Sequence, residues 1–284
     1  MSEDPRAWVG RWEEMEDLIT AWPVQALQAT LDLTDPEPSA GDSLPPLWHW
    51  LFFLPTVAHS QLGPEGHARL GGFLPPVELP RRMFAGGRFT FHQPLRIGER
   101  AKRVGTVIRV EEKQGRTGRL VFIVVRYEIT GEDGLAIVEE QDLVYREAPD
   151  GPEVPAPGVE PIPSHPWSRS VDPDPVMLFR FSALTFNAHR IHYDHPYVTE
   201  VERYPTLIVH GPLTALLLAD LARREGPGPL GAFSFRARAP LFVGATFTLV
   251  GGPNGGQSAA LSAWSHTARL SLTAEAELAI GEES

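Results

Sequence analysis

Polar residues that could do chemistry gather in one stretch of the chain, FSALTFNAHRIHYDH at residues 181–195. Within it lie three of the ten histidines, one asparagine and one aspartate: Asn187, His189, His192, Asp194 and His195. An imidazole titrates near neutral pH, so it can take up and return a proton during a reaction. The stretch predicts a general-base site, a metal site or a polar loop, and the residues by themselves leave these three open.

The metal interpretation is the weakest of the three. His189, His192, Asp194 and His195 are all zinc ligands by type, but an HxxH pair needs a helix or tight turn and no second cluster completes the set. The chain has no cysteine, which excludes disulfides, thiolate nucleophiles and cysteine-ligated metal sites. No GxSxG elbow occurs, and GGPNGGQ at 251–257 lacks the lysine and the spacing of a phosphate loop. We therefore expect no metal and no redox cofactor.

Composition narrows the class of protein. The formal net charge of −11 argues against nucleic-acid binding, which needs a basic face. No apolar run approaches the roughly 20 residues that span a bilayer, so no membrane association is expected. The N-terminal MSEDPRAWVG lacks the features of a secretory signal, and we expect a cytoplasmic protein. Lysine occurs only at Lys102 and Lys113, so an anionic ligand would need a local pocket of arginines.

The chain divides into two similar halves. Nine prolines between Ala148 and Pro175 predict a linker over 148–175, between an N-terminal half, 1–147, and a C-terminal half, 176–284. GRFTF at 87–91 matches GAFSF at 231–235, and PLRIG at 94–98 matches PLFVG at 240–244. The offset is 144 residues for the first match and 146 for the second. Two matches in order at nearly one offset predict a duplicated domain.

Each half is expected to combine an antiparallel meander with a helix. Alternating and β-branched runs predict strands, separated by turns such as GEDG and GGPNGG: residues 101–113, 119–130, 135–147, 247–252, 258–266 and 268–278. HGPLTALLLADLARRE predicts a buried helix that ends at Gly226. In the first half, residues 11–33 have apolar residues at helical spacing around a kink at Pro23, and LPPLWHWLFFLP is a short apolar helix or turn. The predicted class is α+β with tandem halves.

The stretch FSALTFNAHRIHYD, followed by YPTLIVHGPLTALLL, resembles the hydratase motif of the MaoC-like double-hotdog acyl-thioester hydratases and dehydratases. The similarity is strongest to the mesaconyl-CoA and itaconyl-CoA hydratases and the mitochondrial 3-hydroxyacyl-thioester dehydratase, and LPPLWHWLFFLP also resembles that group. The resemblance covers about a quarter of the chain at the level of motifs. It implies a tandem (double) hotdog, with an antiparallel sheet wrapped around a central helix in each half.

The resemblance also implies which residues are catalytic. The family motif pairs an aspartate with a histidine five residues later; His192 stands at the histidine position, and Asn187 stands where the family has aspartate. An amide exchanges no proton at neutral pH, so Asn187 can orient water or substrate but cannot act as the base. His192 is then the expected base, and the backbone N–H of Gly211 at a helix start is the expected oxyanion donor, because Pro212 has no N–H.

Further residues are expected to bind the substrate: His189, Arg190, His210, Arg236 and Arg238. Arg236 and Arg238 alternate on a predicted strand and could bind the phosphates of coenzyme A, while Arg190 and Arg203 could bind a carboxylate of a dicarboxylic acyl group. The plainer alternatives are structural histidines and solvated arginines. An acyl-carrier protein is the alternative handle for the acyl group.

The predicted activity is the reversible hydration of an α,β-unsaturated acyl-CoA, with a small branched or dicarboxylic acyl group such as mesaconyl or itaconyl. Coenzyme A enters only as part of the substrate. A non-catalytic acyl-thioester-binding protein and a hotdog thioesterase are the alternatives. A homodimer is expected from the family. The sequence leaves open the acyl chain, the physiological direction and the stereochemistry.

Overall fold

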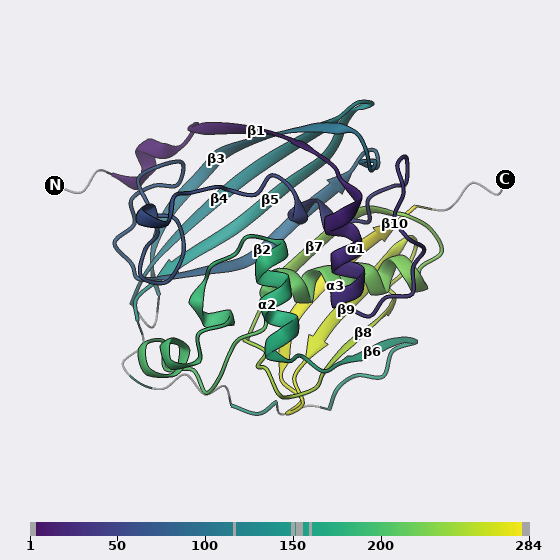
Figure 1. The fold of residues 1–284 in the computed structure, drawn as a ribbon. Helices are drawn as coiled ribbons and strands as arrows, with labels where there is room; N and C mark the ends of the chain where they lie inside the picture. Colours follow the sequence, from purple (N-terminus) through teal and green to yellow (C-terminus); the bar gives the residue numbers. More distant parts are fainter. Residues whose placement is uncertain (1–3, 116–117, 149–150, 152–155, 159–160, 280–284) are drawn as a thin grey trace.

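The computed structural model describes residues 4–115, 118–148, 151, 156–158 and 161–279. Its framework is a ten-stranded antiparallel sheet with the order β1-β3-β4-β5-β2-β7-β10-β9-β8-β6 (Figure 1). The strands are β1 (Trp12–Leu18), β2 (Arg81–Phe91), β3 (Arg100–Gly115), β4 (Gly118–Gly131), β5 (Gly134–Arg146), β6 (Trp167–Val171), β7 (Leu230–Ala237), β8 (Phe247–Pro253), β9 (Ser258–Trp264) and β10 (Leu270–Leu278).

Three α-helices lie over the concave side of this sheet: α1 (Ala21–Thr30), α2 (Pro175–Leu184) and α3 (Gly211–Glu225) (Figure 1). Short turns of helix complete the described elements: η1 (Pro5–Trp8), η2 (Trp48–Leu51), η3 (His59–Gln61), η4 (Arg190–His192) and the π turn η5 (Tyr197–Val201). No helix in the described ranges is both long enough and apolar enough to cross a bilayer.

The two halves meet at the centre of the sheet, where β2 pairs with β7. Phe89 lies directly opposite Phe233, and these are the central positions of the repeated GRFTF and GAFSF segments. The order of strands on one side of this pair repeats on the other, so an approximate twofold axis passes between the two phenylalanines. The predicted tandem arrangement is confirmed, and both glycines that end the PLxxG repeats, Gly98 and Gly244, have a positive φ, as a tight turn requires.

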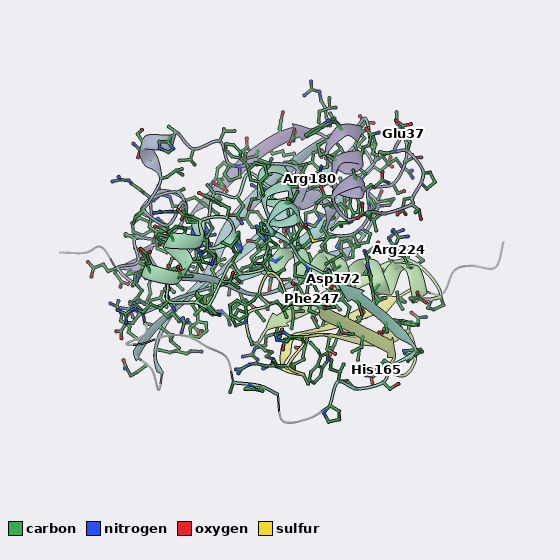
Figure 2. The ribbon with its side chains drawn as sticks, turned by 60° about the horizontal axis from the view of Figure 1, so that its bottom comes forward. Glu37, His165, Asp172, Arg180, Arg224 and Phe247 are labelled. Carbon is green, nitrogen blue, oxygen red and sulfur yellow. The ribbon has the colours of Figure 1, made fainter. Side chains whose placement is uncertain are left out.

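The six strands predicted from alternation correspond to β3, β4, β5, β8, β9 and β10. The helix predicted at HGPLTALLLADLARRE is α3, and each of its residues from Leu213 to Ala222 is buried. It packs across β7 to β10. In its last turn Arg223 and Arg224 pair with the buried Asp220 and with Asp35, in the loop after α1; Figure 2 shows Arg224 at this end of the helix.

The N-terminal half differs from the expectation in two respects. Residues 12–18, predicted to be helical, form the edge strand β1, with burial that alternates along WEEMEDL. The helix begins only at Ala21, so Pro23 lies in its first turn, where its missing N–H costs nothing, and produces no kink. Among the described residues of this half, α1 is the only α-helix and the turns η1, η2 and η3 are shorter still, so a long central helix exists in the C-terminal half alone.

The proline-rich range 148–175 is not wholly a linker. Residues 167–171 form β6, which pairs with β8 and closes the outer edge of the C-terminal half. Asp174 then caps α2 by accepting a hydrogen bond from the Met177 N–H at 2.7 Å. Prolines on either side of β6 are compatible with an edge strand because an edge strand leaves part of its backbone unpaired.

Candidate active site

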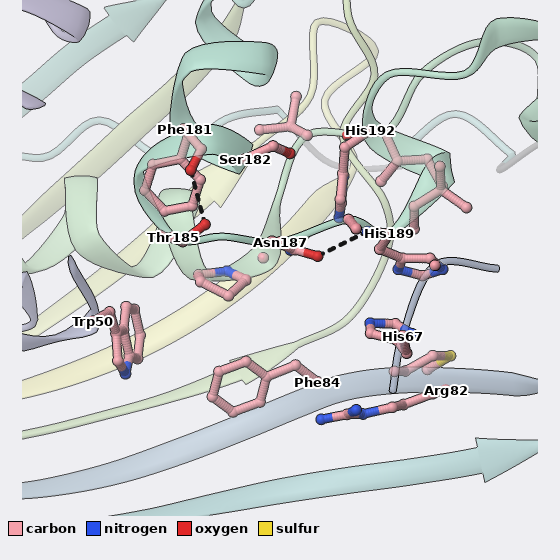
Figure 3. Close-up of a pocket in the computed structure, with 18 of the residues that line it drawn as sticks. Trp50, His67, Arg82, Phe84, Phe181, Ser182, Thr185, Asn187, His189 and His192 are labelled. Carbon is pink, nitrogen blue, oxygen red and sulfur yellow. Dashed lines mark hydrogen bonds between the residues drawn. The ribbon is translucent and has the colours of Figure 1, made fainter. Parts of the chain in front are cut away.

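A cavity of about 1200 Å³ lies between the two halves. Its wall is built from both: the loop 50–68 and strand β2 of the N-terminal half, and the end of α2, the loop 185–193, the start of α3 and residues 237–241 of the C-terminal half. Figure 3 shows part of this wall, with Trp50, Phe84, Asn187 and His192 around the open space. The volume lies just above the roughly 300–1000 Å³ that is usual for small-molecule sites.

His192, in the turn η4, lines this cavity with only 6% of its surface exposed. Its Nδ1 lies 2.7 Å from the carbonyl oxygen of Ile208. A carbonyl can only accept, so Nδ1 must bear the hydrogen and Nε2 is left as a proton acceptor. Burial lowers the pKa of His192 to about 4, against the smaller opposing effect of the Ile208 hydrogen bond. The imidazole is therefore neutral at physiological pH and ready to accept a proton.

His210 lies behind His192 and not in the wall of the cavity. Its ring stacks on that of His192, with centroids 3.6 Å apart and planes 19° from parallel. It is fully buried, and its Nε2 lies 2.8 Å from the Ser182 hydroxyl. His210 was expected to contact the substrate, but it does not line the cavity. Instead it supports His192, because the stacked ring fixes the plane of the His192 imidazole.

Asn187 lines the cavity just after the end of α2. Its side-chain Oδ1 accepts a hydrogen bond from the backbone N–H of His189 at 3.0 Å. The backbone N–H of Asn187 donates to the Ser182 carbonyl at 2.8 Å. Phe186, one residue before, has a φ of 47°, which turns the chain sharply into the loop. Since Oδ1 is engaged by this local turn, the Nδ2 amide is the group that Asn187 can offer to water or substrate.

Gly211 is the first residue of α3 and also lines the cavity. Within the part of the chain that the structure describes, no acceptor takes its N–H. His210 is the N-cap of α3, so the stacking of its ring on His192 brings the imidazole and the start of the helix together. The positive end of the helix dipole lies at this same point.

The N-terminal half adds two residues to this centre that the sequence did not reveal, His67 and Arg82. The His67 ring lies 4.2 Å from the His189 ring, which lies 5.5 Å from the His192 ring (Figure 3). Burial lowers the pKa of His67 well below its usual value, and the positive charge of Arg82 adds to this effect. His189 lines the cavity as expected, and its pKa is likewise lowered by burial.

Three of the arginines singled out from the sequence lie elsewhere. Arg190 donates to Asp194 Oδ2 at 2.9 Å and to the Pro64 carbonyl at 3.0 Å, and its guanidinium lies over the Tyr197 ring, outside the cavity wall. It joins the two halves. Arg203 is exposed and also outside the wall. Arg236 is exposed and lines a separate hollow with Arg88, on the other face of the sheet. Only Arg238, of the arginines proposed for substrate, reaches the cavity.

The charge of the cavity wall is opposite to that of the chain. Among the described residues that line it there are no carboxylates, whereas five arginines take part: Arg82, Arg103, Arg146, Arg238 and Arg269. The chain itself has a formal net charge of −11. A water-filled hollow with low-dielectric walls and one sign of charge concentrates ligands of the opposite sign. The cavity is therefore suited to an anion.

A buried polar cluster holds one wall of the cavity in place. Glu139 is buried and accepts from His49 Nε2 at 3.0 Å, from Trp50 Nε1 at 2.9 Å and from Gln141 Nε2 at 2.7 Å. Hydrogen bonds and the charge of His49 lower the pKa of Glu139 although its burial opposes this, so it is ionised. Trp50 and Gln141 both line the cavity. Glu139 thus connects the core of the N-terminal half to the cavity.

Replacing Glu139 by alanine is expected to lower the free energy of unfolding by about 3–5 kcal/mol, because the buried His49 and two half-buried donors, Trp50 and Gln141, lose their acceptor. Glu140 provides a matched control on the other face of β5, where it pairs with the exposed Arg88 and Arg126. Glu140→Ala is expected to cost about 1 kcal/mol or less. Chemical denaturation of both variants measures the difference, and equal losses would contradict the buried role of Glu139.

No group of three or more histidine, aspartate or glutamate side chains in the described residues is arranged to hold a metal ion.

The chain matches the family model for hydroxyacyl-thioester dehydratase type 2 over residues 47–243. That range includes the loop 50–68, β2 and the whole 181–214 region. The chain belongs to the hydroxyacyl-thioester dehydratase type 2 family. It is therefore a hydro-lyase that acts on acyl thioesters, and the resemblance seen in the motif is confirmed.

Curated relatives span nearly the full chain. A mesaconyl-C(4)-CoA hydratase from Chloroflexus aurantiacus is 53% identical over 256 residues, which is 89% of this chain and 91% of the relative. A mitochondrial hydroxyacyl-thioester dehydratase type 2 from Schizosaccharomyces pombe is 28% identical over 260 residues, covering 81% of this chain and 86% of that protein.

Solved structures confirm the fold. HtdX of Mycobacterium tuberculosis is 19% identical, with a TM-score of 0.65 over 95% of this chain and 100% of that chain. A second M. tuberculosis protein, described as having a double hotdog fold, is 13% identical, with a TM-score of 0.58 over 95% of this chain and 96% of that one. The double-hotdog member of the α+β class predicted from the sequence is thus the observed fold.

Proposed function

We propose that this family member adds water to the conjugated double bond of a branched dicarboxylic acyl-CoA such as mesaconyl-C4-CoA, and removes it in reverse. The observation that supports this best is the union, in one cavity, of a neutral imidazole with a free acceptor nitrogen, His192, and an uncommitted amide at a helix start, Gly211. The 53% identity to a mesaconyl-C(4)-CoA hydratase and the arginines of the cavity wall support the choice of acyl group.

In the proposed hydration, His192 Nε2 accepts a proton from water as the water oxygen attacks Cβ. Electrons move from the double bond through Cα to the thioester carbonyl, where an enolate oxygen develops. The Gly211 N–H and the dipole of α3 stabilise this oxygen. The imidazolium then returns its proton to Cα, which restores the neutral base. The stack with His210 and the bond to Ile208 hold the ring in one orientation through both transfers.

Asn187 has a positioning role in this scheme. Its Nδ2, for which the described residues offer no acceptor, lies at the place where the wider family has a carboxylate, so it can hold the oxygen of the attacking water or of the thioester but takes no proton. Arg238, which is exposed and reaches the cavity, is the proposed partner for the coenzyme A phosphates.

The oxyanion role of Gly211 can be tested by removing its N–H. Proline is tolerated in the first turn of a helix, and a Cβ at this position would find Phe84 O no nearer than 4.0 Å. Gly211→Pro is expected to lower kcat about 10²–10³-fold through loss of one donor. Gly211→Ala keeps the N–H and adds a side-chain carbon, and it is expected to stay near wild-type activity. A similar loss in both variants would refute the assignment.

The function itself is tested by incubating the protein with mesaconyl-C4-CoA, itaconyl-CoA and crotonyl-CoA. Loss of enoyl-thioester absorbance without release of free thiol is the expected result. Thiol release would identify a thioesterase, and binding without turnover would identify a non-catalytic thioester-binding protein. Either outcome would overturn the proposal.

Three narrower points remain part of this proposal. Catalysis needs no metal or other cofactor, because the described residues account for each proton transfer and for the oxyanion. We further propose that the protein forms a homodimer, as the family resemblance implies, and that it acts in the cytoplasm. Sedimentation of the purified protein tests whether it is a homodimer.

A further inference from the structure

We infer that Arg82 binds the free carboxylate of the acyl group and thereby selects dicarboxylic over monocarboxylic acyl thioesters. This inference rests on the proposed function and names the residue that would set its substrate class. The sequence suggested Arg190 and Arg203 for this task, and neither lines the cavity.

Arg82 occupies the inner face of β2, opposite Tyr145 of β5. It is half-buried and lines the cavity together with Phe84, whereas Arg88, on the same strand, is exposed and pairs with Glu140 and Asp142 on the other face. Figure 3 shows Arg82 beside His67, with His189 above it. Its charge also contributes to the lowered pKa of both histidines.

Arg82 has no hydrogen-bond or ion-pair partner in the part of the chain that the structure describes. Three other arginines, one next to Arg82 in the chain and two in the cavity wall, are occupied. Arg81, the preceding residue, pairs with Glu202 at 2.8 Å. Arg103 lies over the Phe53 and Tyr127 rings. Arg269 donates to the Ala156 carbonyl at 2.7 Å. A half-buried guanidinium without a neighbouring anion is unfavourable. A cavity with such a guanidinium in its wall is therefore suited to a ligand that supplies the anion.

The position of Arg82 matches the chemistry of the acyl group. In a C4 thioester of mesaconate, the free carboxylate is attached to Cβ, the carbon that water attacks. His192 must therefore lie near Cβ, and the carboxylate must lie one bond further on. His189 lies between His192 on one side and His67 and Arg82 on the other. The centroid of its ring is 5.5 Å from that of His192 and 4.2 Å from that of His67. A carboxylate directed past His189 reaches the guanidinium, whose two-pronged donor geometry it fits.

The test compares Arg82→Gln with Arg88→Gln, the same change on the other face of the same strand. With mesaconyl-C4-CoA, Arg82→Gln is expected to lower kcat/KM about 100-fold, the scale of a lost hydrogen-bonded charge pair. With crotonyl-CoA, which lacks the carboxylate and has one carbon substituent fewer on Cβ, the same variant is expected to stay within about threefold of wild type. Arg88→Gln is expected to leave kcat/KM unchanged for both substrates.

Binding of unreactive analogues separates this inference from the proposed function. Succinyl-CoA and butyryl-CoA differ by a carboxylate in place of a methyl group, and calorimetry measures each without turnover. Wild type is expected to prefer succinyl-CoA, and Arg82→Gln is expected to lose that preference. If wild type hydrates no enoyl-CoA but shows this pattern, the proposed reaction fails and the role of Arg82 stands.

Several results would overturn the inference: equal losses with mesaconyl-C4-CoA and crotonyl-CoA, unchanged activity with both, or a wild-type protein without preference for succinyl-CoA. If Arg82→Gln does not fold, Arg82→Lys replaces it, because lysine keeps the charge but lacks the planar fork. A loss confined to the carboxylated thioesters then supports the inference, and an equal loss with both kinds rejects it.

Discussion

Replacing His192 by asparagine is expected to lower kcat/KM for hydration by about 10³–10⁴-fold, while the protein stays folded. The amide of asparagine reaches the place of Nδ1 and can still donate to the Ile208 carbonyl, which the wild-type ring approaches to 2.7 Å. Nothing in the variant occupies the place of Nε2. The loss therefore measures the proton transfer itself and not the collapse of a buried hydrogen bond.

His195 supplies the control for this substitution. It lies three residues away in the same histidine-rich stretch, but it is exposed and outside the cavity wall. His195→Asn is expected to have wild-type kinetics. Steady-state rates with mesaconyl-C4-CoA and thermal unfolding of both variants make the comparison. A His192→Asn protein that keeps more than about a tenth of the wild-type rate would exclude His192 as the base.

The stability of the protein is expected to fall steeply in weak acid because four imidazoles, three of them buried and one half-buried, must stay neutral in the folded state. Burial lowers the pKa of each: His67, His189, His192 and His210. The unfolded chain binds protons at these residues below about pH 6.5 and the folded chain does not. Stability is therefore complete above pH 6.5 and is lost as the pH falls. For His192, with a folded pKa of about 4, the loss approaches about 3 kcal/mol at pH 4.

Urea unfolding at pH 8, 7, 6 and 5 measures this dependence. The free energy of unfolding is expected to stay level from pH 8 to 7 and to fall below pH 6.5. His67→Gln removes one of the four groups and should flatten the curve, whereas the exposed His195→Asn should leave it unchanged. Glu139 acts in a lower window, because its depressed pKa gives stability that is lost only below about pH 4.5. Constant stability down to pH 5 would contradict the neutral state of these histidines.

Local patterns predicted much of this fold. Alternating apolar and polar residues predicted the six meander strands. A run of leucine and alanine between a proline and a glycine predicted α3. Both predictions succeeded because the face of an element that packs against the core determines where its apolar residues fall. The strand β1 was mistaken for a helix because its apolar residues, Trp12, Met15 and Leu18, recur every three positions. Because β1 is an edge strand with no fully buried residue, its apolar residues did not have to alternate strictly with polar ones.

The site was predictable only where one segment contains it. Asn187, His192 and Gly211 lie within one motif region, but His67 and Arg82 come from more than 100 positions earlier, in the loop 50–68 and in β2, and join them only in the folded chain. Neither belongs to a pattern that local sequence could reveal. Arg190 was misjudged although a local signal existed, because Asp194 follows it by four residues, the usual spacing of an ion pair on a helical turn.

The central pairing of β2 with β7 has a consequence for how the two copies of the domain can differ. Two separate identical subunits would have to present the same helix and the same motif on both sides of their contact. Covalent fusion removes that requirement. One copy keeps the long helix α3 and the candidate catalytic residues. In the other, residues 67–81, which the offset of 144 residues matches to α3, form no helix, and this leaves the room that becomes the cavity. Asymmetry between duplicated parts is what gives this chain space for its ligand.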